Sequence, residues 1–199
     1  MTPPRPCSAD EAVARALSLV GRGGAYELGG GDYHPAGGVD LPWTQNGEGL
    51  LVCDCSRFAI CWCYRLPGAR PGFNAGSWAT VSGHINPNSA IEDADHRREL
   101  FARAATPFLG ALIMYPTIRL AGHADPWIGH VQIVTGLARC TEWDAAHPDW
   151  SLLDTAECKG PPGRSPGVVA GTGASMSAHD RDWPKPAHRT VMLRVLQQP

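Results

Sequence analysis

Apolar residues recur every three to four positions in three stretches of the chain, which is the spacing of one face of a helix. The first stretch, residues 8–20, opens with Ser8 and Glu11 placed as a capping box. The second begins at Cys55, and the third spans residues 90–105. The pattern therefore predicts three helices.

Shorter apolar runs bounded by Gly, Pro or Asp dominate the second half of the chain, and such runs are typical of strands. Because helices come first and strands follow, the order favours an α+β fold with N-terminal helices packed on an antiparallel β-sheet. We predict a short buried segment and four strands, at residues 50–52, 109–115, 130–136, 150–158 and 190–196.

The length of 199 residues suits a single domain over residues 1–199. We place its core at about residues 8–158, with a C-terminal strand near 188–197. Residues 160–187 are rich in Pro, Gly and Ser, and we predict that they form a long surface loop.

The formal net charge is −2 and the basic residues are scattered, so no positively charged surface for nucleic acid is expected. No apolar run approaches the ~20 residues of a membrane span, and no signal peptide is evident. We therefore expect a soluble protein that is made in the cytoplasm and reaches any outside site of action by export or delivery.

Seven cysteines are present, an odd number, and we expect most of them to be buried free thiols. Four of them form a C-x-C-x5-C-x-C pattern over residues 53–63, which leaves a zinc or iron–sulfur site as an alternative. The residues between them have the pattern of a buried helix. The prediction is therefore that the chain binds no metal and no other cofactor.

Asp54-Cys55-Ser56 stands where the second predicted helix begins, a position that suits a thiol nucleophile. Asp is a good N-cap residue, which would place Cys55 in the first turn. There the partial positive charge of the helix favours the thiolate, and free backbone N–H groups can bind an oxyanion. Cys55 is thus the candidate nucleophile.

The candidate base is His130, which follows Gly129 and opens a predicted strand. A histidine within hydrogen-bond reach would take the thiol proton and later protonate the leaving group. A third polar group must orient the imidazole, and the next strand and its approach offer Glu157, Asp154 and His147. We favour Glu157 because it lies in the apolar stretch.

At these positions the chain resembles the NlpC/P60 family of papain-like cysteine peptidases. Asp54-Cys55-Ser56-Arg57 corresponds to the nucleophile motif Asp-Cys-Ser-Gly, and Gly129-His130-Val131-Gln132-Ile133 corresponds to the base motif Gly-His-Val-Gly-Ile. Tyr26-Glu27-Leu28-Gly29-Gly30 resembles Tyr-x-x-Gly-Gly, and residues 107–113 resemble the Pro-x-x-Gly-Asp start of a strand. The four motifs follow the family's order over about residues 9–158.

The resemblance implies a papain-like fold and hydrolysis of amide bonds in bacterial peptidoglycan peptides. It also implies that Cys55 is the nucleophile, that His130 is the base and that Tyr26 lies near the oxyanion. Three departures from the family's pattern leave the substrate preference open. The family has glycine, glycine and aspartate at the positions of Arg57, Gln132 and Ala111, respectively.

Two other hypotheses stay open on the sequence. The Cys55–His130 pair could act on a non-wall substrate as an amidase, deamidase or transamidase, or the chain could be a non-catalytic cysteine-rich binding module. The expected partner is a peptidoglycan peptide, joined by an immunity or inhibitor protein if the chain is a delivered toxin. The expected place of action is the periplasm or the cell wall.

Overall fold

The computed structural model describes residues 7–22, 24–27, 44–45, 51–66, 86–119, 127–160, 167–183 and 185–196. Its helices are α1 (Ala9–Leu19), η2 (Arg57–Cys63), α2 (Pro87–Glu92), η3 (Asp93–Arg97), η4 (Trp150–Leu152), α3 (Ala174–Asp182) and η5 (Pro186–His188). Its strands are β1 (Ala25–Tyr26), β2 (Thr44–Gln45), β3 (Leu51–Cys53), β4 (Phe101–Arg103), β5 (Leu112–Arg119), β6 (Trp127–Gly136), β7 (Asp154–Lys159), β8 (Gly167–Thr172) and β9 (Val191–Val195).

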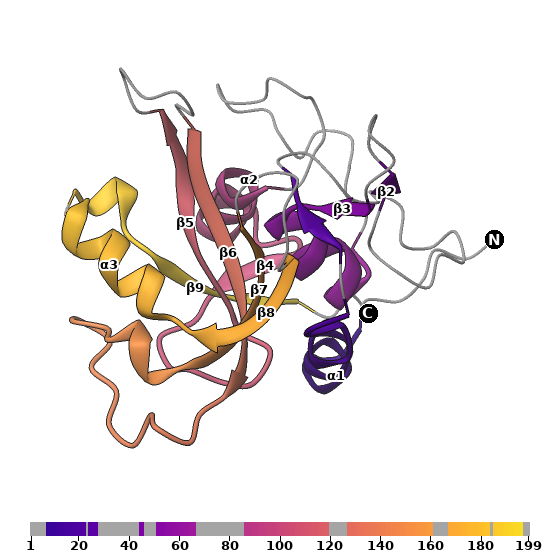
Figure 1. Cartoon of the computed structure of the whole chain (residues 1–199). Helices are drawn as coiled ribbons and strands as arrows, with labels where there is room; N and C mark the ends of the chain where they lie inside the picture. The colour runs from indigo at the N-terminus through magenta and orange to yellow at the C-terminus, as the bar shows by residue number, and fades with distance from the viewer. Residues whose placement is uncertain are drawn as a thin grey trace.

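A six-stranded sheet in the order β4-β9-β5-β6-β7-β8 forms the centre of the fold (Figure 1). All of its ladders are antiparallel. The short strands β1, β3 and β2 form a second, three-stranded sheet. The predicted α+β class with an antiparallel sheet is therefore confirmed.

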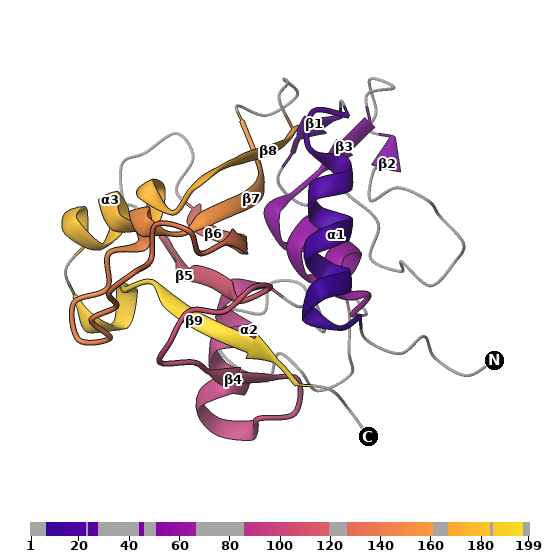
Figure 2. The same cartoon turned by 90° about the horizontal axis from the view of Figure 1, so that it is seen from below.

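Alternate side chains of the large sheet face two different cores, as the two-residue period of a strand requires. Figure 2 shows α1 and α3 on opposite sides of this sheet. The core on the side of α1 and η2 includes Leu112, Met114, Val131, Ile133 and Leu193. The core on the side of α3 and η4 includes Ala111, Ile113, Val134, Met176 and Met192.

Helix α1 begins as the sequence predicted. The Ser8 side chain accepts a hydrogen bond from the Glu11 N–H (3.2 Å), and the Glu11 carboxylate accepts one from the Ser8 N–H (2.7 Å). Gly21 follows the helix with a φ of 73°, a conformation that glycine adopts readily. The buried face of α1 packs against η2 and the sheet.

The predicted helix over residues 90–105 is wrong in its second half. Helical structure ends at Arg98, which has a left-handed φ of 54°, and Phe101–Arg103 form β4. The buried Asp93 carboxylate explains this change of direction, because it accepts hydrogen bonds from three backbone N–H groups after the helix. These belong to Glu99, Leu100 and Phe101, at 3.2, 2.9 and 2.8 Å.

The predicted surface loop at residues 160–187 is also wrong, because this segment contains β8 and α3. Strand β8 pairs with β7 along its length, and α3 buries Met176 and His179. Only two of the nine residues of α3 are buried, so its sequence has little of the apolar periodicity that predicts a helix. Residues 161–166 and 184 lie outside the described part of the chain.

The remaining strand predictions fall on strands, with shifted ends. Strand β5 starts at Leu112, so residues 109–111 precede it. Strand β6 covers its predicted positions, and β9 covers residues 191–195 of the predicted 190–196. The predicted strand at 150–158 is β7 in its second half only, since Trp150–Leu152 form a single 3₁₀ turn. The short buried segment at 50–52 corresponds to β3.

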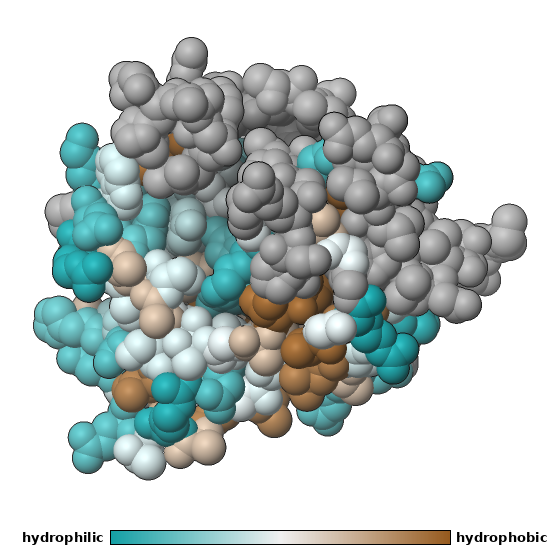
Figure 3. Space-filling view, viewed as in Figure 1, coloured by the Kyte–Doolittle hydropathy of each residue, from teal (hydrophilic) through white to brown (hydrophobic). Residues whose placement is uncertain are grey.

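Few large apolar side chains are highly exposed among the described residues. Figure 3 shows apolar side chains on the face where β8 passes α1, next to mostly polar surface around α3. Among the described residues, the large apolar side chains with high exposure are Leu17 (47%) and Leu109 (41%), and isolated cases of this kind are ordinary. In the described part, no helix is long and apolar enough to cross a membrane.

Candidate active site

Cys55 lies in the first turn of a helix that Asp54 caps. The Arg57 N–H donates to Asp54 Oδ1 (2.7 Å), and the Phe58 N–H donates to the Asp54 carbonyl (3.0 Å). Residues 55–64 are helical, with the π-helical segment η2 inside them. The predicted cap is thus confirmed, and it uses the amides of Arg57 and Phe58 rather than those of Cys55 and Ser56.

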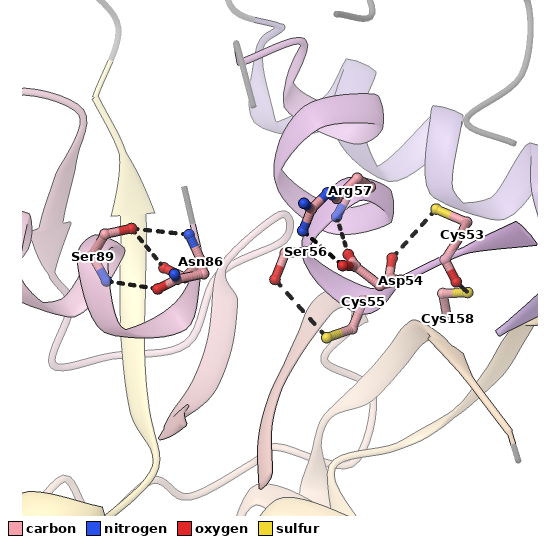
Figure 4. Close-up of polar contacts among 8 residues, drawn as sticks. All are labelled: Cys53, Asp54, Cys55, Ser56, Arg57, Asn86, Ser89 and Cys158. Carbon is pink, nitrogen blue, oxygen red and sulfur yellow. Dashed lines mark hydrogen bonds and ion pairs between the residues drawn. The ribbon is translucent and has the colours of Figure 1, made fainter. Parts of the chain in front are cut away.

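The Asp54 carboxylate also forms a buried ion pair with Arg57, from Oδ2 to a guanidinium nitrogen at 2.7 Å. Burial lowers the pKa of Arg57 to about 10. Figure 4 shows the Cys55 thiol directed away from this pair, with the Ser56 hydroxyl at 4.0 Å from the sulfur. Arg57 therefore neutralises the capping carboxylate.

The structure brings the imidazole of His130 together with both Cys55 and Glu157. His130 Nε2 lies 2.5 Å from Glu157 Oε2, and the Cys55 thiol lies close enough to the ring to raise its pKa. Burial by itself would lower the pKa of His130, but the hydrogen bonds and negative charges of Cys55 and Glu157 outweigh it and raise the pKa to about 9.

Glu157 is the partner of His130 among the three orienting residues that the sequence offered. Its side chain is 1% exposed and also contacts Lys159 Nζ and Gln132 Nε2. Burial would raise the pKa of Glu157, but the contacts with His130, Lys159 and Gln132 lower it to about 2. Asp154 instead pairs with Arg139 at the surface, and His147 pairs with Asp144.

Gly129 permits a close approach of β5 to the residue before His130. A Cβ at this position would lie 2.2 Å from Thr117 Oγ1 and 2.8 Å from Thr117 Cα, which is impossible without displacement. Thr117 sits at an irregularity of the β5–β6 ladder, where its N–H donates to Asn88 Oδ1 of α2 (2.6 Å). The residue before His130 is thus fixed by contacts with β5, which α2 supports.

Tyr26 lies near the helix that carries Cys55, but its catalytic role stays a prediction. It pairs with Cys53 in the parallel β1–β3 ladder, two residues before Cys55. It is close enough to Arg57 to affect the pKa of that guanidinium. Residues 28–30, the rest of its motif, lie outside the described part of the chain.

Three residues near Cys55 and His130 were not predicted as members of the site, namely Gln132, Ser175 and Tyr115. Gln132 Nε2 donates to Glu157 Oε2 (2.8 Å) and to Ser175 Oγ of α3 (2.9 Å). Tyr115 is paired with His130 across β5 and β6, with 6.1 Å between the ring centroids. The alternation of β6 was a usable signal for Gln132, because residues two apart in a strand share a face.

The cysteines are all free thiols, and six of the seven are buried, as expected. Burial raises the pKa of Cys53, which lies beside Cys158, whose thiol donates to the Cys53 carbonyl at 3.3 Å (Figure 4). Burial likewise raises the pKa of Cys63. Within the described residues, no group of three or more His, Cys, Asp or Glu side chains has a metal-site arrangement.

Comparison of the chain with family models, with curated proteins and with solved structures gives no match. Function is therefore inferred from the residues and their geometry. That geometry is a thiol at a helix tip, a nearby imidazole and a buried carboxylate at 2.5 Å from the imidazole.

Proposed function

We propose that this chain is a cysteine peptidase or amidase that cleaves an amide bond through a thioester on Cys55. The proximity of the Cys55 thiol to His130, whose Nε2 lies 2.5 Å from Glu157 Oε2, carries the proposal. This is the order of nucleophile, base and orienting group that acyl transfer requires. The helix tip adds a partial positive charge beside the sulfur.

In the proposed cycle His130 already holds the proton of the Cys55 thiol before the substrate binds, so the reacting pair is a thiolate beside an imidazolium. The sulfur attacks the amide carbon, and the carbonyl electrons move onto its oxygen. The backbone N–H groups of Cys55 and Ser56 are the candidate donors to this oxyanion, because the cap uses the next two amides. Collapse of the intermediate breaks the C–N bond and leaves a thioester.

His130 then supplies the proton that the leaving amine needs. With a pKa of about 9, it carries this proton over the neutral range. After the amine departs, neutral His130 takes a proton from water, and the resulting hydroxide attacks the thioester. The acid is released and Cys55 is regenerated, so the cycle consumes one water for each amide bond.

The proposed substrate is a peptide of bacterial peptidoglycan, within a papain-like arrangement of the NlpC/P60 type. The support is the order of four short motifs and the observed packing of the Cys55 helix against an antiparallel sheet that carries His130 and Glu157. These features also suit other amide substrates, so the choice of bond is for experiment to decide.

The proposal is tested by incubating the protein with purified bacterial cell wall and measuring released peptides. We expect release by the wild type and by Cys140→Ala, which removes the half-buried thiol outside the site. Cys55→Ala should release none. Failure of the wild type to release peptides would reject the wall substrate, and release by Cys55→Ala would reject the thioester mechanism.

A further inference from the structure

Gln132 is a fully buried side chain placed directly behind the Glu157 carboxylate. Its neighbours Val131 and Ile133 face the core beside α1 and η2, so Gln132 faces α3 on the opposite side of the sheet. Its amide nitrogen has two hydrogens, one for Glu157 Oε2 at 2.8 Å and one for Ser175 Oγ at 2.9 Å.

These two bonds restrict the orientation of the carboxylate. The terminal torsion of a glutamate is soft, so Glu157 needs contacts at its oxygens to keep one of them aimed at His130. Oε1 is held by Lys159, whose own side chain is about half exposed, and Oε2 is shared by His130 and Gln132. Gln132 is thus the buried neutral donor that fixes the oxygen facing the imidazole.

We propose that Gln132, backed by Ser175 of α3, is a positioning residue that holds Glu157 against His130. The inference rests on the proposed function, since it takes Cys55, His130 and Glu157 as the reacting unit. A glycine at this position, as in the motif that the chain resembles, has no side chain to make either bond. The support for the carboxylate therefore comes from this chain's own replacement.

Helix α3 also supports His130, through a contact that does not involve Gln132. His179 of α3 stacks on Tyr115 with ring centroids 3.7 Å apart and an interplanar angle of 5°. Tyr115 in turn is the β5 partner of His130. The segment that the sequence suggested as a surface loop thus supports both the imidazole and its carboxylate.

The test measures the rate at which iodoacetamide alkylates Cys55 as a function of pH, because this readout needs no substrate. The charged and polar groups around Glu157 are His130 and Gln132 from β6, Lys159 from β7, Ser175 from α3, Tyr115 from β5 and Cys55. Gln132→Leu removes one donor from this set. We expect alkylation at neutral pH to slow about three- to tenfold and its pH midpoint to rise by about half to one unit.

Two further variants separate positioning from packing. Ser175→Ala removes the outer acceptor from an exposed position of α3 and should slow alkylation about twofold, with the midpoint moving in the same direction. Thr155→Val is the matched control, because its buried hydroxyl on β7 has no hydrogen-bond partner in the described residues. Thr155→Val should leave the alkylation profile unchanged.

The outcomes distinguish this inference from the proposed function. A wild type in which Cys55 reacts no faster than the other thiols would reject the reacting unit itself. A reactive wild type with an unchanged midpoint in Gln132→Leu, even if that variant melts earlier, would reject the positioning role alone. If Gln132→Leu does not fold, an unchanged midpoint in Ser175→Ala rejects it instead.

Discussion

At the scale of single residues, the site depends on the attraction between the charged imidazole of His130 and the carboxylate of Glu157, which are both largely buried. Their side chains are 13% and 1% exposed, for His130 and Glu157. The pKa of His130 is raised to about 9 and that of Glu157 is lowered to about 2, in both cases against the effect of burial. Between these pKa values both groups are charged, so neutralising either group removes the charge that stabilises the ionised form of the other.

Replacing Glu157 by Gln keeps the shape of the side chain and removes its charge. We expect kcat on a cleavable amide to fall about 10- to 100-fold, because His130 loses the partner that orients and stabilises its protonated form. The alkaline limit of the pH–rate profile, set by His130, should move below 9. Steady-state rates across pH measure both effects.

Asp154→Asn is the control for this substitution. Asp154 lies on the same strand, but its side chain is 40% exposed and pairs with Arg139 at the surface. Its rate and its pH profile should match those of the wild type. A profile of Glu157→Gln that also matches the wild type would remove Glu157 from the mechanism.

Sequence reasoning reached Cys55, His130 and Glu157 because each stands at a recognisable place, at a helix start, at a strand start or in an apolar run. It did not reach Ser175, because that residue lies in a segment without helical pattern. Gln132 was noticed as a departure from a motif, and its role depends on which face of β6 is turned to α3. That choice of face is a property of the assembled sheet.

At the scale of elements, the position of His130 is set by how closely β5 and β6 approach. Gly129 faces Thr117 with no space for a Cβ, and Asn88 of α2 holds the backbone of Thr117 by two hydrogen bonds. The start of the strand that carries His130 is therefore held by contacts among β5, β6 and α2.

Gly129→Ala should separate the two strands beside His130. We expect a loss of about 1–3 kcal/mol in the free energy of unfolding, typical of overpacking, and a fall in the rate of Cys55 alkylation. Urea denaturation and alkylation kinetics measure these effects. Gly171→Ala in β8 is the control, because a Cβ there meets nothing within 4 Å, and equal effects at the two glycines would contradict this explanation.

Asp93 joins two elements by ending the helical segment and starting β4. Asp93→Ala would leave three backbone N–H groups without their acceptor in a largely buried region, so we expect a loss of about 3 kcal/mol or more in urea denaturation. Asp95→Ala removes an exposed pair with Arg103 and should cost under about 1 kcal/mol. Similar losses in both variants would refute the role of Asp93.

The same carboxylate explains an error of the sequence-based prediction. Apolar residues at helical spacing continue to Ala104, yet the chain turns at Arg98 and forms β4 against β9. A periodicity argument cannot detect an aspartate that captures amides six to eight positions later. The capping box of α1 was predictable because its bonds connect residues three positions apart.

At the scale of the whole molecule, the central sheet is buried on both faces, and the candidate site draws on elements from both sides. The Cys55 helix packs on one face, whereas α3 supports Gln132 and Tyr115 from the other. The stability of the fold and the charge state of the site are therefore linked through His130.

This linkage has a definite sign. The folded-state pKa of His130, about 9, lies above its ordinary value of 6.5, so its stabilising contribution is complete below about pH 6.5 and is lost as the pH rises through 9. We expect the difference in unfolding free energy between the wild type and His130→Gln to shrink over this interval. Urea denaturation at a series of pH values measures it, and a constant difference would contradict the raised pKa.

Limited alkylation with iodoacetamide near neutral pH shows whether Cys55 is the activated nucleophile that the proposed function requires. Six cysteines are buried and Cys140 is half-buried, so accessibility alone would direct the label to Cys140. Activation by His130 predicts instead that Cys55 is labelled first in the wild type and loses this preference in His130→Ala. Labelling that favours Cys140 in the wild type, or that keeps its preference for Cys55 in His130→Ala, would contradict the activation of Cys55 by His130.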